Sequence, residues 1–307
     1  MMLRFAFRRS LQMVPVLFAT VTLTFFLIRL APGGPFTDER ARSPETIRQL
    51  NAHYGLDAPI MTQYGRYLWK LVHGDMGPSF KSNQKVQDII AQTFPVSLEL
   101  GCYAMLFALV VGLAAGLSAA LKPRSFWRDH LPMTVAMTGI CIPSFVLGPL
   151  LVLWFSLGLN WVSASGWQTA GDKILPALTL GAAYAAYIGR LFRGSMLEIL
   201  PQDYIRTARA KGAREFRVIF VHAMSNALPP VVAFLSPAFA GIITGSFVVE
   251  TVFQIPGMGR MFVTAAFNRD YTLLLGLVVF YSVIVVIFNI LSDMLLIWLN
   301  PGLRNHE

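Results

Sequence analysis

The chain has 307 residues and a net charge of +9, and 55% of its residues are hydrophobic while only 13% are charged. Soluble domains usually carry about 25% charged residues, so this composition, with a mean hydropathy of +0.57, excludes an ordinary soluble protein and favours a membrane protein. The two cysteines are too few for a disulfide framework or a zinc site.

Six segments are apolar over about 20 residues, the length that a helix needs to cross a bilayer. They cover residues 9–30, 97–121, 131–158, 174–192, 227–252 and 272–299. Such segments are too long for barrel strands, and a helix satisfies its own backbone polar groups in lipid. The sequence therefore predicts an all-α polytopic membrane protein with six transmembrane helices.

The first apolar segment follows Arg4, Arg8 and Arg9, as a signal peptide would. Its length of about 20 residues exceeds the h-region of a cleavable signal, and no small-x-small cleavage site precedes Ala31-Pro32-Gly33. We therefore expect an uncleaved first span.

The long segment 31–96 that follows contains enough apolar and aromatic residues to be structured. Between Pro59 and His73 these residues recur at helical spacing, which predicts an amphipathic helix. The pattern leaves two interpretations open. The helix either forms a surface for a partner or the membrane interface, or it packs on the outer ends of the spans.

Several residues within the spans are candidates for a pathway or for packing. Pro143, followed by Ser144, removes a backbone donor and should kink the third span. Pairs of glycines at the spacing Gly112-x-x-x-Gly116 and Gly241-x-x-x-Gly245 allow close helix contacts within the bundle or between subunits. The kink is equally consistent with a transport pathway and with a crowded bundle.

Two acidic residues complete the candidates. Glu250 falls near a span end, where a long side chain can reach the interface. Asp293 lies deeper in the last span, one turn after Asn289. It is either a proton site or pathway-facing group, or a carboxylate hydrogen-bonded to a neighbouring helix.

The placement of charge predicts the orientation. Basic residues near span ends remain in the cytoplasm, and the loops 122–130 and 193–226 are basic while the segments 31–96, 159–173 and 253–271 are nearly balanced. We therefore expect residues 1–8 and 300–307, and hence both termini, on the cytoplasmic side.

The loop 193–226 contains a short helix of its own. Pro201 ends the helix that continues from the fourth span, Asp203 is a suitable N-cap, and Gly212 is a natural stop. Residues 203–212 combine small alanines with Arg206, Arg209 and Lys211. Such a helix either docks another protein closely or lies on anionic lipid.

Motifs of known chemistry are absent from the sequence. It contains no G-x-x-x-x-G-K-[ST] loop, no H-E-x-x-H and no G-x-S-x-G. We therefore predict no catalytic residue, no metal ligand and no cofactor bound by this chain, and the protein is not expected to be an enzyme. Nothing indicates a nucleic-acid partner.

The string from Arg206 to Gly212 resembles the coupling motif of binding-protein-dependent ABC importer permeases, with Arg206 in place of the usual Glu. The whole chain resembles the oligopeptide members of the peptide branch of that family, more than the dipeptide members. The strings that carry the resemblance are Asp203 to Gly212 with His222 and Ala227-Leu228-Pro229, Gly245 to Phe253, Pro256-Gly257-Met258-Gly259, Asn268-Arg269-Asp270-Tyr271, and Arg29 to Thr37.

The resemblance implies a type I ABC importer permease, with an N-terminal span and periplasmic region over 1–95 and a five-span core over 96–307. It implies a second permease subunit, two ATPase subunits that use ATP and Mg, a peptide-binding protein and a bacterial inner membrane. The residues that would couple to the ATPases are Tyr204, Arg206, Thr207, Ala208, Arg209, Ala210, Lys211 and Gly212. A dipeptide, nickel or glutathione permease and, more remotely, a secondary peptide carrier are the alternatives.

Overall fold

The computed structural model of the protein describes residues 2–30, 33–36 and 44–299. The expectations for residue 1, for Ala31-Pro32 and Thr37, and for the terminus 300–307 lie outside these ranges. Within them the chain is helical, and the only β-structure is one antiparallel bridge between Pro78 and Lys85. The all-α prediction is confirmed for the described residues.

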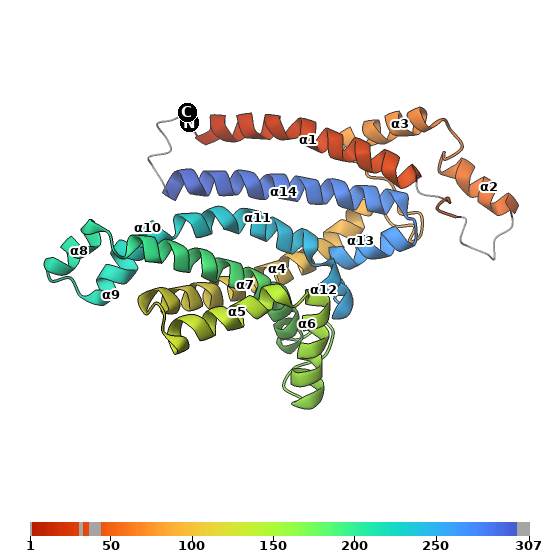
Figure 1. Cartoon of the computed structure of the whole chain (residues 1–307). Coiled ribbons are helices and arrows are strands. Elements are labelled where there is room, and N and C mark those ends of the chain that lie inside the picture. Colours follow the sequence, from red (N-terminus) through yellow and green to blue (C-terminus); the bar gives the residue numbers. More distant parts are fainter. Residues whose placement is uncertain (1, 31–32, 37–43, 300–307) are drawn as a thin grey trace.

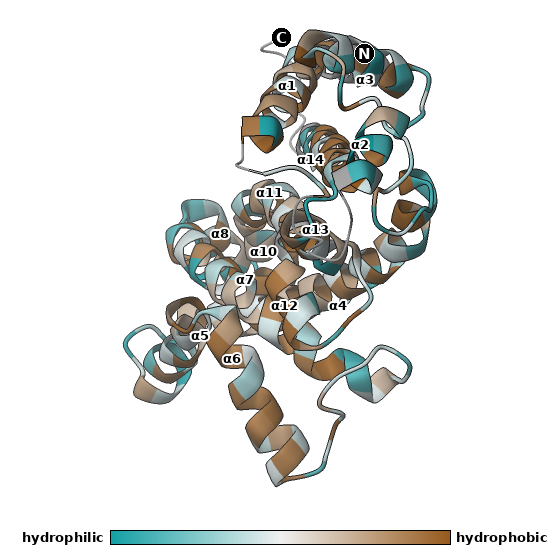
Figure 2. Ribbon diagram, turned by 90° about the vertical axis from the view of Figure 1, so that its right-hand side faces the viewer, coloured by the Kyte–Doolittle hydropathy of each residue, from teal (hydrophilic) through white to brown (hydrophobic). Residues whose placement is uncertain are grey.

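Five segments of the described chain are long and apolar enough to cross a membrane, and a bent helix pair makes six if it counts as one span. They comprise α1 (Met2–Leu30), α4 (Val86–Leu121), α7 (Ala170–Ile199), α11 (Pro229–Gly245) with α12 (Phe247–Val252), and α14 (Tyr271–Leu299). In Figure 1 the long helices α1, α4, α7, α11 and α14 run side by side, and in Figure 2 hydrophobic residues predominate along most of them. The predicted spans are thus present, although most helices extend beyond the predicted limits.

The third predicted span, 131–158, is not one kinked helix. It consists of α5 (Leu131–Cys141) and of α6 (Ser144–Leu151) with the π-helical segment η2 (Val152–Gly158), and the two parts meet at 111°. Ile142 is extended because a residue before proline avoids the helical region, and Pro143 precedes α6 with no backbone N–H to offer. The predicted kink is therefore a complete break.

The contact between α4 and α7 is the most extensive in the described bundle. A Cβ atom at Gly112 would lie 2.6 Å from the Ala185 carbonyl oxygen, and one at Gly116 would lie 2.6 Å from that of Gly189. Backbones approach this closely only where a side chain is missing. The Gly112-x-x-x-Gly116 pair therefore serves packing within this chain.

The outer segment before α4 contains α2 (Pro44–His53), which the sequence did not reveal, and α3 (Ile60–Val72), which it did. One face of α3 packs on α1: Tyr67 stacks on Phe25 with ring centroids 5.7 Å apart, and the Tyr64 hydroxyl lies 2.7 Å from that of Thr22. The opposite face exposes Trp69 and Val72. The amphipathic helix thus packs on a span and still presents an apolar surface.

Helix α4 begins at Val86 rather than at residue 97. Val86, Ile89 and Ile90 are buried in a small apolar cluster with Met258 and Leu273, which belong to α13 (Met258–Phe267) and α14. Tertiary packing therefore supports the extra turns at the outer end. The helix also runs through residue 95, which was expected to separate an N-terminal region, 1–95, from the core, 96–307.

Candidate functional site

The predicted coupling segment forms the separate helix α8 (Asp203–Ala210). It lies at one end of the bundle beyond the long helices, beside α9 (Glu215–Arg217) (Figure 1). Helix α7 ends at Ile199 before Pro201, as expected. The N-cap is Gln202 instead of the predicted Asp203, whose charge lies in the first turn, where it favours the helix dipole.

The C-terminal end of α8 is a Schellman motif. Gly212 has a φ of +81°, and its N–H donates to the Arg209 carbonyl oxygen while the Ala213 N–H donates to that of Ala208. A side chain at position 212 would strain this left-handed conformation. The predicted stop at Gly212 is therefore confirmed.

The two faces of α8 differ. Ile205 is fully buried and Ala208 is half-buried against the main apolar cluster. The remaining predicted coupling residues are exposed, and they are Tyr204, Arg206, Thr207, Arg209, Ala210, Lys211 and Gly212. Ala208 thus packs α8 onto the bundle. The surface available to a partner is polar and basic, and it includes small side chains.

Polar contacts fix α8 to the following segment. The Arg209 guanidinium donates to both carboxylate oxygens of Glu215, at 3.2 and 2.7 Å. This interaction is the main reason why the pKa of Glu215 lies below its usual 4.5. Partial desolvation of the carboxylate acts in the opposite direction. The Asn226 side-chain amide donates to the Tyr204 hydroxyl at 3.0 Å. These contacts hold α8 against the segment that follows it.

Glu250 does not reach the membrane interface. Its side chain is fully buried, and it accepts hydrogen bonds from the Ser97 hydroxyl at 2.7 Å, the Ser246 hydroxyl at 2.5 Å and the Arg260 backbone N–H at 2.9 Å. Ser97 in turn accepts the Met258 N–H. The carboxylate therefore joins α4, α12 and the first turn of α13.

The other pathway or packing candidates are dispersed through the bundle. Pro143 is exposed and Ser144 half-buried at the break between α5 and α6, and Asp293 is half-buried in α14. A Cβ at Gly241 would lie 2.9 Å from the Tyr184 hydroxyl of α7, while Gly245 ends α11. The structure does not bring these residues together in one site.

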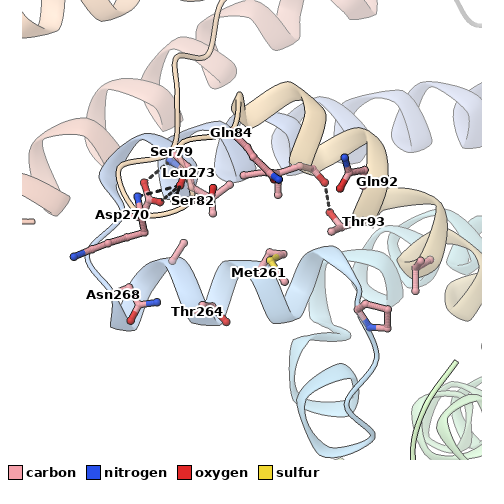
Figure 3. Close-up of a pocket in the computed structure, with 15 residues that line it drawn as sticks. Ser79, Ser82, Gln84, Gln92, Thr93, Met261, Thr264, Asn268, Asp270 and Leu273 are labelled. Atoms are coloured by element: carbon pink, nitrogen blue, oxygen red, sulfur yellow. Dashed lines mark hydrogen bonds between the residues drawn. The ribbon is translucent and has the colours of Figure 1, made fainter. Parts of the chain in front are cut away.

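The outer end of the bundle carries a pocket of about 420 Å³ that the sequence did not predict. In Figure 3 it lies between the segment around Ser79 and α13, with Thr93 at one end, Asn268 at the other and Met261 between them. Buried Asp270 accepts the Ser79 hydroxyl at 2.5 Å and the Phe80 N–H at 3.1 Å. An acidic residue just before a span is the sequence signal that could have indicated this anchor.

The bundle, the broken third span and the short helix inserted between α7 and α11 characterise the fold. Solved structures share the fold. The MetNI methionine ABC transporter in inward-facing conformations aligns over 69% of this chain and 96% of its own, with a TM-score of 0.59 and 17% identity. An amino acid ABC transporter aligns over 68% and 93%, with a TM-score of 0.54 and 14% identity.

The chain belongs to the family described as binding-protein-dependent transport system inner membrane component, whose model matches residues 112–305. The N-terminal model of the same group matches residues 2–101. The chain is 49% identical to the oligopeptide transport system permease protein OppB of Salmonella typhimurium, over 99% of this chain and 100% of that protein. It is 41% identical to the dipeptide permease DppB of Bacillus subtilis, over 100% and 99%, and 38% identical to the glutathione permease GsiC of Escherichia coli, over 99% of each.

Proposed function

We propose that this chain is the permease subunit of an ATP-driven oligopeptide importer and forms half of the translocation pathway. The observation that carries the proposal is the 49% identity, over practically the full length, to a permease named for oligopeptide transport. The lower identities to the dipeptide and glutathione permeases make those solutes the alternatives, together with nickel.

We infer that a second permease completes the pathway, that two cytoplasmic subunits bind ATP and Mg and hydrolyse the ATP, and that a binding protein delivers the peptide. The chain itself would bind no cofactor and catalyse no reaction. The family description, which ties these permeases to a binding protein, supports this assembly. The proposed location is the bacterial inner membrane.

The proposed mechanism couples the ATPases to the spans through α8. Because α8 lies between the ends of α7 and α11 and is fixed by the Arg209–Glu215 pair, a movement of a docked ATPase would be transmitted to both helices. Such rigid-body transmission through a two-state interface is a general mode of switching. Pro143, Ser144, Gly241, Gly245, Glu250 and Asp293 remain candidates for the helices that respond.

The proposal is tested by purifying the tagged chain from its native membrane in mild detergent and by measuring ATP-dependent uptake of a labelled peptide. The informative variants are Ala210→Glu and Arg206→Glu, because both residues are exposed on α8. Ala208→Glu is less suitable, since a charge at this half-buried position would also disturb the core. Lys122→Glu, at an exposed position in another basic loop, is the matched control.

The wild-type chain and Lys122→Glu should recover a second permease and the ATPase subunits. The α8 variants should keep the second permease, lose the ATPases and lose uptake. Undiminished ATPase recovery and uptake in both α8 variants would refute the docking role. Uptake by the isolated chain in vesicles without ATP would instead identify a secondary carrier.

A further inference from the structure

A second polar site lies at the same end of the bundle as α8. The π-helical segment η1 (Phe126–His130), α5 and the end of α7 enclose a pocket of about 500 Å³. Its lining includes Asp129, His130, Met133, Thr134, Arg190 and Arg193. Nothing in the proposed coupling mechanism uses this pocket.

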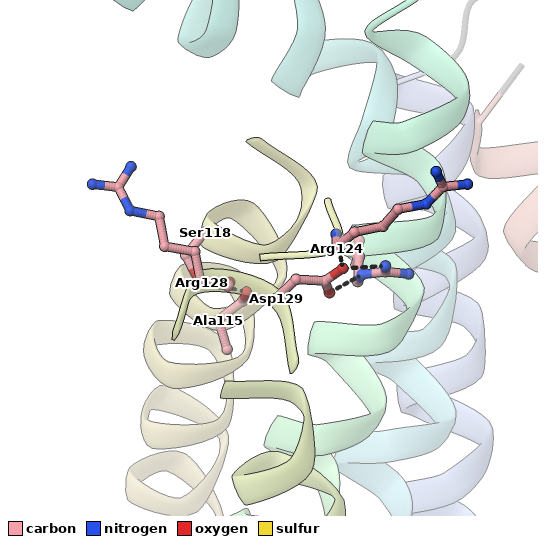
Figure 4. Close-up of polar contacts among 6 residues, drawn as sticks. Ala115, Ser118, Arg124, Arg128 and Asp129 are labelled. Carbon is pink, nitrogen blue, oxygen red and sulfur yellow. Dashed lines mark hydrogen bonds and ion pairs between the residues drawn. The ribbon is translucent and has the colours of Figure 1, made fainter. Parts of the chain in front are cut away.

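The only carboxylate of the pocket is already neutralised. Asp129 accepts two hydrogen bonds from the Arg193 guanidinium, at 2.7 and 2.8 Å, and one from the Arg124 backbone N–H at 2.9 Å. Figure 4 shows Asp129 directed toward these donors, while Arg128 extends to the other side. A bidentate pair of this kind fixes both side chains.

Because Asp129 is paired with Arg193, the positive charge of Arg190 gives the pocket a net positive charge. Arg190 is exposed, and its guanidinium contacts the Met137 sulfur at 3.8 Å. Among the described residues no carboxylate lies within ion-pair distance of it. An arginine so close to apolar helix surface is stabilised by an anion that accepts its planar fork of donors, and a phosphate matches that geometry.

The surroundings place the pocket at the level of lipid headgroups. Arg190 lies near the end of the predicted fourth span, 174–192, and within α7. On η1 the rings of Phe126 and Trp127 are 61% and 74% exposed, and tryptophan is enriched at membrane interfaces. Along α5 the apolar side chains of Leu131 and Val135 are also exposed.

We propose that this pocket binds the headgroup of an anionic phospholipid. Arg190 holds the phosphate, Thr134 and His130 lie beside it, and the acyl chains follow the exposed apolar side of α5. Basic pockets between helices near a membrane surface are suited to such lipids. The apolar and aromatic surface around the pocket favours a lipid over an acidic side chain of a partner subunit. The site goes beyond the proposed transport function and does not depend on which solute is carried.

The test measures thermal unfolding of the purified full chain in mild detergent during titration with dioctanoyl phosphatidylglycerol, dioctanoyl phosphatidylcholine or inorganic phosphate. Phosphatidylglycerol should raise the unfolding midpoint, and the other two should not. Arg190→Gln should raise the apparent Kd for phosphatidylglycerol about tenfold, because it removes a charge-assisted hydrogen-bonding group. Arg190→Lys should recover part of the affinity, and Arg217→Gln, which removes an exposed charge at the same end, should not change it.

Thr134→Asp provides an independent variant, since it introduces a negative charge at an exposed position of the pocket and should abolish the response to phosphatidylglycerol. An equal response to phosphatidylcholine would overturn the proposal, as would the same loss in Arg217→Gln. An equal response to inorganic phosphate would indicate a site for free anions. If Arg190→Gln leaves lipid binding intact but releases a second permease during purification, the pocket is a subunit contact instead.

Discussion

At the residue scale, Glu250 shows how one polar side chain can connect distant parts of a membrane protein. Three donors from different elements meet its carboxylate, and the Ser97 hydroxyl that reaches it belongs to a residue 153 positions earlier in the chain. Glycine at position 257 leaves room for this arrangement, because a Cβ there would overlap the Glu250 carboxylate. Buried polar groups of this kind stabilise a structure only while every partner is present.

Replacing Glu250 by Gln should therefore lower stability by about 1–3 kcal/mol, since an amide nitrogen facing these donors leaves at least one of them without an acceptor. The measurement is the thermal unfolding midpoint of the purified chain. Glu198→Gln, at an exposed position near the end of α7, should leave the midpoint unchanged. Equal midpoints for wild type and Glu250→Gln would show that the network does not contribute to stability.

The ion pair between Arg209 and Glu215 should behave differently, because both side chains are more than one-third exposed. The lowered pKa of Glu215 means that the pair stabilises the folded state above pH 4.5 and that this contribution disappears as the pH falls through the lowered pKa. Solvent screening limits it to about 0–1 kcal/mol.

Glu215→Gln should accordingly lower the unfolding midpoint slightly at neutral pH, and the difference from wild type should vanish in acid. A difference that grows as the pH falls below the usual pKa of a glutamate would contradict this assignment of the pKa shift. High salt at neutral pH should reduce the difference in the same way.

At the scale of elements, the contact between α4 and α7 determines how the core of the bundle is built. Gly112→Ala would place a methyl group 2.6 Å from the Ala185 carbonyl oxygen and 2.9 Å from the Ile188 side chain. The two helices would have to separate, at a cost of about 1–3 kcal/mol. The thermal unfolding midpoint should fall.

Gly65→Ala in α3 is the control, because a Cβ there meets no atom within 4 Å. This substitution should be neutral or stabilise the protein by about 0.5–1 kcal/mol through the conformational preference of alanine. If the two substitutions have the same effect, the close approach of α4 and α7 is not the reason for glycine at position 112.

At the scale of the whole molecule, the orientation predicted from charge would place one end of the bundle in the cytoplasm. Helix α1 begins and α14 ends on the same side of the bundle as α8, while α3 and α13 lie at the other end (Figure 1). A membrane that covers the apolar helices would therefore separate α8 from α3.

We test this orientation with single cysteines in a chain whose Cys102 and Cys141 are replaced by serine, since both are exposed. A cysteine at Trp69 in α3 should react with a membrane-impermeant maleimide in cells whose outer membrane has been permeabilised. A cysteine at Ala210 in α8 should react only after the inner membrane is broken. The reverse pattern would invert the proposed topology.

Local patterns were sufficient for the elements that depend on local forces. The apolar segments located the spans because the length of a membrane helix is set by the bilayer. Pro201 and Gly212 located α8 because a missing N–H and a left-handed residue end helices whatever surrounds them. The helical spacing between Pro59 and His73 likewise revealed α3.

Tertiary structure decided the features that depend on distant residues. The sequence indicated a disturbance at Pro143, but the angle of 111° is a property of the folded chain, in which α6 packs on α12. Folding likewise decided that Glu250 is buried and that Ala208 faces the bundle. It also created the pockets around Asp270 and Arg190. Their partners are supplied by other helices, and hydropathy and spacing describe only the neighbours of a residue along its own helix.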